Sequence, residues 1–197
     1  MRSAQPKLIF INRYFYPDHS ATSQMLTDLV FGLAKSECQH AIHIVTSRQR
    51  YDDASAKLLP FETVNHVTIH RVATARFGRQ NLMGRAIDYL SFYMSAFATL
   101  IKLTQKGGTL IAKTDPPLIS VVAAVVAKHK RAHLVNWLQD LFPEVAAQLG
   151  DKLASGFPYK ILKALRNKTL QQAKMNVAVE KTFHFNRNQE YLALCTM

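Results

Sequence analysis

The sequence predicts an α/β protein with a mainly parallel sheet covered by helices on both faces. Short apolar runs typical of strands alternate along the chain with longer segments whose apolar residues recur at helical spacing. Connections of about ten or more residues suit the crossovers that parallel strands need. Gly and Pro are few, at 7 each, and no repeat or low-complexity segment interrupts the pattern. We therefore expect one doubly wound domain.

The first half of the chain supplies three expected strands and one helix. The helix is indicated by apolar residues at the spacing of Met25, Leu29 and Val30, with Ser20, Thr22 and Ser23 available to cap it. The third strand is indicated by the alternation around Val67 and Ile69. The expected strands cover residues 7–15, 41–47 and the segment around 67–69.

The second half continues the alternation. A long helix is expected over residues 82–103, and a further helix after Asp115-Pro116-Pro117, whose prolines suit a first helical turn. A short helix should end at Gly150, and a basic helix should follow Pro158. The remaining strands are expected at 109–114, 133–138 and 175–179.

Composition limits the class of protein. Twenty-five Lys and Arg against 13 Asp and Glu give a net charge of +12, which attracts polyanions such as nucleic acid, anionic lipid or phosphorylated substrates. A generally basic surface without a specific partner is the alternative. Only Cys38 and Cys195 are present, and the N-terminus lacks a signal-peptide core, so a cytoplasmic location is expected.

Three segments follow expected strands and should share one edge of the sheet, where ligands of open α/β sheets bind. They cover residues 16–23, 114–117 and 139–144. The first combines Asp18, an imidazole at His19 and hydroxyls before a helix start, which favours a phosphate or carboxylate. Helix capping explains the same residues equally well. Asp115 is expected to cap the following helix.

Asp140 and Glu144 are the more suggestive carboxylates, because Trp137 and Phe142 lie beside them in the sequence. Such a carboxylate holds a sugar hydroxyl or acts as a base. The alternative is that it caps a helix or supports a neighbouring site residue. Familiar phosphate, metal and nucleophile motifs are missing: the sequence has no G-x-G-x-x-G, G-x-x-x-x-G-K-[ST], H-E-x-x-H or G-x-S-x-G. We expect no metal site.

Residues 89–101 form an uncharged run that is too short to span a bilayer, which needs about 20 residues. Burial in the core is the favoured interpretation. The alternative is a surface that dips into a membrane interface, with four arginines at or near its start. These are Arg71, Arg76, Arg79 and Arg85.

The segments NRYFYPDHSATSQ at 12–24, TDPP at 114–117 and WLQDLFPEVAAQLG at 137–150 together resemble the N-terminal domain of bacterial family-four glycosyltransferases. These are retaining enzymes of the GT-B fold, so the resemblance implies a Rossmann-like domain over about residues 1–180. It also implies an acceptor that is a glycan or lipid-linked sugar of a capsule, O-antigen or exopolysaccharide. The nucleotide-sugar donor would be held by a separate C-terminal domain, without a metal.

The same resemblance places the site. His19, Ser20, Ala21 and Thr22 would lie near the donor phosphates, and Asp140 and Glu144 on the cleft wall. The expected substrate-binding residues are Asp18, His19, Ser20, Ala21, Thr22, Asp115, Gln139 and Asp140, with Asp140, Glu144 and His19 as catalytic candidates.

Two departures from the family bear on function. Ser20-Ala21 stands where many relatives carry Gly-Gly, and no two of the five glutamates have the seven-residue separation of the donor site. Residues 181–197 no longer resemble the family, which predicts a truncated enzyme or one half of a split enzyme, inactive alone. A membrane-docking scaffold at the inner face of the cell membrane is a second hypothesis. A nucleic-acid-binding domain is a third and is disfavoured, because no recognition motif is present.

Overall fold

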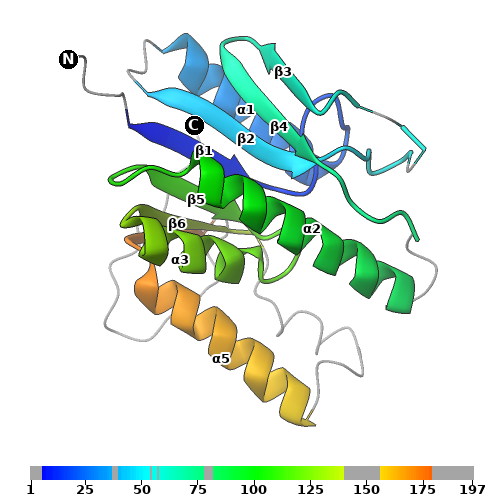
Figure 1. Ribbon diagram of the computed structural model, residues 1–197, viewed down its shortest axis with the longest axis vertical. Coiled ribbons are helices and arrows are strands. Elements are labelled where there is room, and N and C mark those ends of the chain that lie inside the picture. The colour runs from blue at the N-terminus through cyan, green and yellow to red at the C-terminus, as the bar shows by residue number, and fades with distance from the viewer. Residues whose placement is uncertain are drawn as a thin grey trace.

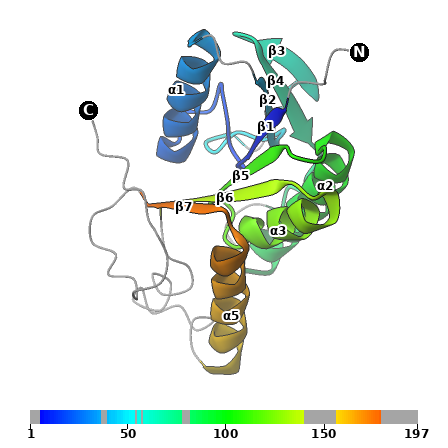
Figure 2. The same ribbon diagram turned by 90° about the vertical axis from the view of Figure 1, so that its left-hand side faces the viewer.

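The computed structural model describes residues 6–36, 40–53, 55–56, 58–77, 82–139 and 156–178. These residues form one sheet of seven strands in the order β3-β4-β2-β1-β5-β6-β7 (Figures 1 and 2). The strands are β1 Lys7–Ile11, β2 Ala41–Ser47, β3 Phe61–Val64, β4 Val67–Val72, β5 Thr109–Lys113, β6 His133–Leu138 and β7 Met175–Ala178.

All neighbouring strands pair in parallel except β3, which is antiparallel to β4. With β3 left aside, the parallel strands cross the sheet in the chain order 3-2-1-4-5-6, which is the Rossmann-like doubly wound arrangement. The predicted fold class is therefore confirmed. The direction of winding reverses between β1 and β5, and this reversal is where such folds bind ligands.

Helices lie on both faces of the sheet (Figure 2). Helix α1, Ala21–Lys35, covers one face. Helices α2, Leu82–Leu103, and α3, Ile119–Lys130, cover the opposite face, and α5, Gly156–Gln172, packs on α3. The α2 bounds agree with the helix predicted from the sequence.

The alternation of side chains in β1 explains the two cores. Ile9 and Ile11 enter the cluster under α2 and α3, whereas Phe10 enters the cluster under α1 with Leu26 and Val30. A strand with apolar side chains on both sides is buried on both sides, so the sheet needs helices on both faces. The period of the sequence thus determines the layering.

Three local features differ from the sequence predictions. β1 ends at Ile11 instead of residue 15, because the backbone N–H of Arg13 donates to Asp115 O (2.8 Å) in a neighbouring loop. β3 was not predicted; it forms a hairpin with β4 through Asn65 and His66, which both have positive φ. The prolines at 116 and 117 precede α3, which starts at Ile119. The expected helix ending at Gly150 and the tail 181–197 lie outside the described residues.

Candidate functional site

An open pocket of about 540 Å³ lies at the edge of the sheet where β1 and β5 end, which is the point of winding reversal. Residues from the loop after β1, the start of α1, the loop after β2, the start of α2 and the loop after β5 form its walls. They are Arg13, Tyr14, Ser20, Ala21, Thr22, Tyr51, Arg85, Tyr89, Thr114, Asp115 and Pro117.

The backbone fixes these loops to one another. Arg13 N donates to Asp115 O at 2.8 Å, and Ser47 N donates to Arg13 O at 3.0 Å, which joins the ends of β1, β2 and β5. Gln139 follows β6 at the same edge, and its Nε2 lies 3.0 Å from Met25 Sδ on α1. The prediction that these loops share one edge is confirmed for the described residues. Asp140 and Glu144 lie outside them.

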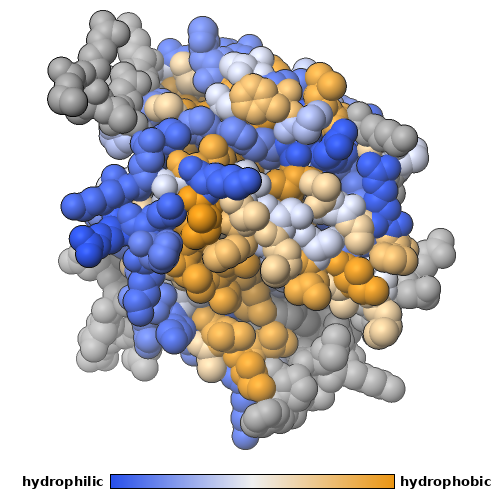
Figure 3. All heavy atoms as spheres, in the orientation of Figure 1, coloured by the Kyte–Doolittle hydropathy of each residue, from blue (hydrophilic) through white to orange (hydrophobic). Residues whose placement is uncertain are grey.

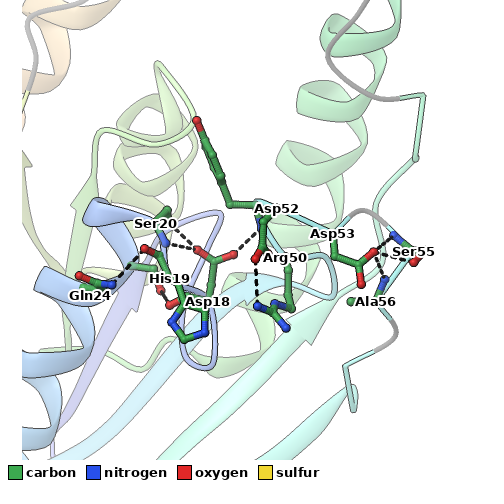
Figure 4. Close-up of polar contacts among 11 residues, drawn as sticks. Asp18, His19, Ser20, Gln24, Arg50, Asp52, Asp53, Ser55 and Ala56 are labelled. Atoms are coloured by element: carbon green, nitrogen blue, oxygen red, sulfur yellow. Dashed lines mark hydrogen bonds and ion pairs between the residues drawn. The ribbon is translucent and has the colours of Figure 1, made fainter.

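Asp18 is buried and its carboxylate is used within the protein. One oxygen accepts hydrogen bonds from Ser20 N (2.8 Å) and Ser20 Oγ, and the other accepts from the backbone N–H of Tyr51. Figure 4 shows the carboxylate between Ser20 and the segment that carries Arg50 and Asp52. Asp18 is absent from the pocket wall, so we reassign it from substrate binding to fixing the loops after β1 and β2 together.

The start of α1 opens directly on the pocket. Ser20 is the N-cap residue, but its hydroxyl is bonded to Asp18 and caps no helical amide. Ala21 and Thr22 form the first turn and line the wall. A helix start without a side-chain cap leaves N–H groups that favour an anion. His19 is exposed beside this turn, where its carbonyl accepts from Gln24 Nε2 at 3.1 Å, and it lies off the pocket wall.

Arg13 brings a buried positive charge to the pocket. Its guanidinium is 3.7 Å from the carboxylate of Asp88 on α2, and that carboxylate also accepts from Phe77 N at 3.0 Å. The guanidinium carbon lies 5.3 Å from the ring centre of Tyr14 and 4.9 Å from that of Tyr89. These contacts hold Arg13 in one position by charge pairing and by cation–π attraction.

Three tyrosines give the pocket aromatic walls. The rings of Tyr14 and Tyr51 meet edge to face with centres 5.6 Å apart, and Tyr89 reaches the pocket from α2. Sequence reasoning missed Arg13 and all three tyrosines. Tyr14 stands inside the 12–24 motif and Tyr51 follows β2, so the sheet-edge rule could have found both. Tyr89 carries no such signal, because only the packing of α2 brings it there.

Asp115 lies half-buried on the pocket wall and does not cap α3, whose N-cap position is Leu118. The expected capping role is therefore wrong for this residue. On the α1 side of β5, buried Lys113 donates to Thr22 O and lies 4.5 Å from the ring centre of Trp137. Burial lowers the pKa of Lys113 to about 8, and the nearby charge of Asp115 opposes this shift. Lys113 thus ties the first turn of α1 to β5.

The arginines that were expected to contact a membrane lie in different environments in the structure. Arg71 is buried, paired with Glu62, and donates to Tyr16 O (2.7 Å) and Leu59 O (3.2 Å), so its expected membrane contact is corrected to an internal one. Arg85 lines the pocket and Arg76 is exposed. Arg79 lies outside the described residues.

Comparison with known proteins leaves the family open: no protein-family model matches the chain, and a search of curated proteins finds no similar sequence. In the described part of the chain, no group of three or more His, Cys, Asp or Glu side chains is arranged to hold a metal ion. None of the described helices combines the length and apolarity needed to cross a bilayer.

Proposed function

We propose that this chain is the acceptor-side domain of a GT-B glycosyltransferase. In this proposal the enzyme moves a sugar from a nucleotide sugar to a glycan or lipid-linked acceptor of a surface polysaccharide. One observation carries the proposal: two segments of the family resemblance, 12–24 and 114–117, supply most of the residues that line the pocket at the winding reversal. That position is the standard ligand site of doubly wound sheets.

The chemistry of the pocket suits a sugar acceptor. Tyr51, which is 53% exposed, and the half-buried Tyr89 offer aromatic surface to the apolar C–H faces of a pyranose ring, and Asp115 offers a carboxylate to sugar hydroxyls. Arg85 adds positive charge to the same walls, and Arg13 adds a guanidinium whose charge is paired with Asp88. A carbohydrate that carries a phosphate or diphosphate group combines all of these features.

The start of α1 is assigned to phosphate in the same proposal. Ala21 and Thr22 present an uncapped first turn, and Lys113 holds this turn in place from below. The donor nucleotide sugar would be bound between this edge and a donor-binding domain, which brings donor and acceptor together for reaction. His19, Asp140 and Glu144 remain the catalytic candidates predicted from the sequence.

Saturation-transfer NMR of the full chain tests the proposal, with methyl glycosides and UDP as observed probes and inorganic pyrophosphate as a competitor. Tyr51 is 53% exposed, so Tyr51→Ala removes a pocket wall at little cost in stability. We expect a glycoside signal in the wild type that Tyr51→Ala loses. Tyr16→Ala is the matched control, since Tyr16 is an exposed tyrosine of the same edge that lies off the pocket wall.

The outcomes separate the proposal from its rivals. Glycoside signals that Tyr51→Ala leaves unchanged would show that sugars bind elsewhere. Competition of UDP or pyrophosphate with the glycosides would place an anion in the same pocket. Binding of UDP with no response to any glycoside would contradict an acceptor site and indicate a nucleotide-binding domain.

A further inference from the structure

The solvent face of α2 is apolar along most of its length. Met83, Ile87, Leu90, Met94 and Phe97 have side chains between 37% and 77% exposed. We call these five residues the α2 stripe. Their spacing of four and three residues places them in one row along the helix.

The α2 stripe lies opposite the face that the fold uses. Asp88, Phe92, Ala96 and Leu100 are buried and follow one another at intervals of four residues, so they face the sheet. On a helix of 100° per residue, the stripe is centred on the other side. A helix on a sheet ordinarily presents polar residues to water there. The core therefore gives no reason for the stripe.

The apolar surface extends beyond α2. Helix α3 packs beside α2, and its outward residue Val125 is 53% exposed. Between α3 and α5 lies a groove of about 560 Å³, with Val121, Val125 and Leu165 in its lining and Lys128 and Lys168 among its polar residues. Figure 3 shows apolar side chains gathered over α2 and α3 on this face, with hydrophilic side chains along one side.

The charge of these three helices has one sign at the surface. The sequences of α2, α3 and α5 contain a single acidic residue, Asp88, and it is buried beside Arg13. Their exposed charged residues are basic: Lys102, Lys128, Lys160 and Lys168. A partner that covers this face must be apolar and anionic at once.

We propose that the α2 stripe and the α3–α5 groove dock the protein on an anionic lipid bilayer. Acyl chains would cover the stripe, and lipid phosphates would pair with the lysines around it. A second copy of the chain fits less well, because it would place basic helices against basic helices. Docking of this kind places α2 in the interface plane without crossing the membrane. The inference holds whether or not the pocket binds sugar.

Co-sedimentation of the full chain with vesicles is the test, using phosphatidylcholine–phosphatidylglycerol and pure phosphatidylcholine. We expect binding to the first that weakens with salt, and much weaker binding to the second. Leu90→Ser should reduce the affinity for anionic vesicles about tenfold, because it removes an inserted apolar side chain. Leu59→Ser is the matched control: Leu59 is 62% exposed against 60% for Leu90, and lies on the loop before β3.

A fluorescence measurement separates insertion from simple adsorption. Met94→Trp places an indole in the stripe, and we expect its emission to shift to shorter wavelength when anionic vesicles are added. Leu59→Trp should show no such shift. Each variant is compared with the wild type by circular dichroism, since exposed substitutions should leave the fold intact.

Lys128→Gln with Lys168→Gln tests the charged part of the surface. The pair should weaken binding to anionic vesicles by about tenfold or more and leave the residual binding to phosphatidylcholine unchanged.

Three results would overturn the inference. The first is no binding to anionic vesicles at low salt. The second is binding that neither Leu90→Ser nor the lysine pair alters, which would place the contact elsewhere. The third is a dimer in light scattering that Leu90→Ser dissociates, because the stripe would then be an interface between copies of the chain.

Discussion

Helices α1 and α2 cover opposite faces of one sheet but expose different kinds of side chain to solvent. α1 buries Leu26 and Val30, and it exposes Met25 and Leu29 among polar neighbours such as Gln24. α2 buries Phe92 and exposes a continuous apolar row. Packing against the core explains which residues of α1 are apolar. In α2 it explains only the buried side, because the exposed apolar row makes no contact that the fold requires.

The largest expected effect separates the two sides of α2. Phe92→Ala should lower the free energy of unfolding by about 3–5 kcal/mol, because Phe92 is fully buried and a cavity remains. Met94→Ala, two residues away and exposed, should change it by less than about 0.5 kcal/mol. Urea denaturation measures both. Equal losses would mean that the α2 stripe is part of the core.

A similar contrast is expected between two arginines. Arg71→Ala should cost about 3 kcal/mol, because it leaves Glu62 and the carbonyls of Tyr16 and Leu59 without their buried partner. Arg76→Ala at an exposed position should cost less than about 0.5 kcal/mol. Thermal denaturation of the two variants compares them. If Arg71→Ala were as stable as Arg76→Ala, the internal role of Arg71 would be wrong.

The pH dependence of stability probes the α1 side of the sheet. The pKa of Lys113 is lowered from 10.5 to about 8 by burial, so the unfolded chain binds more protons between these values. Stability contributed by this residue therefore rises as pH increases from about 8 to 10.5. In Lys113→Met this rise should disappear. Urea midpoints across the range measure it, and parallel curves for the two proteins would contradict the buried position of Lys113.

The smallest expected effect concerns the exposed arginine before α2. Arg76→Gln should weaken binding to anionic vesicles by about fivefold, since a basic residue near such a surface contributes roughly 1 kcal/mol. Arg71→Gln should leave the affinity of the folded fraction unchanged, because its guanidinium is buried. Vesicle co-sedimentation compares the two. An equal loss of affinity in both variants would show that Arg71 contacts the membrane together with Arg76, as the sequence predicted.

The sequence by itself determined the doubly wound fold and which of its loops lie at the candidate pocket. Alternating and helical periods are local properties, and they placed α2 and most parallel strands correctly. The direction of parallel strands then brought Ser20, Ala21, Thr22 and Asp115 to one edge, since each follows a strand.

The tertiary structure decided what depends on packing between distant segments. The uncharged run at residues 89–101 does not reveal which side of the helix is buried, so the α2 stripe can be recognised only from the packing of α2 on the sheet. Arg71 is buried because it pairs with Glu62 on β3 and donates a hydrogen bond to Tyr16 O in the loop after β1. Tyr89 joined the pocket for the same reason: its position is set by contacts across the fold, and these carry no local periodicity.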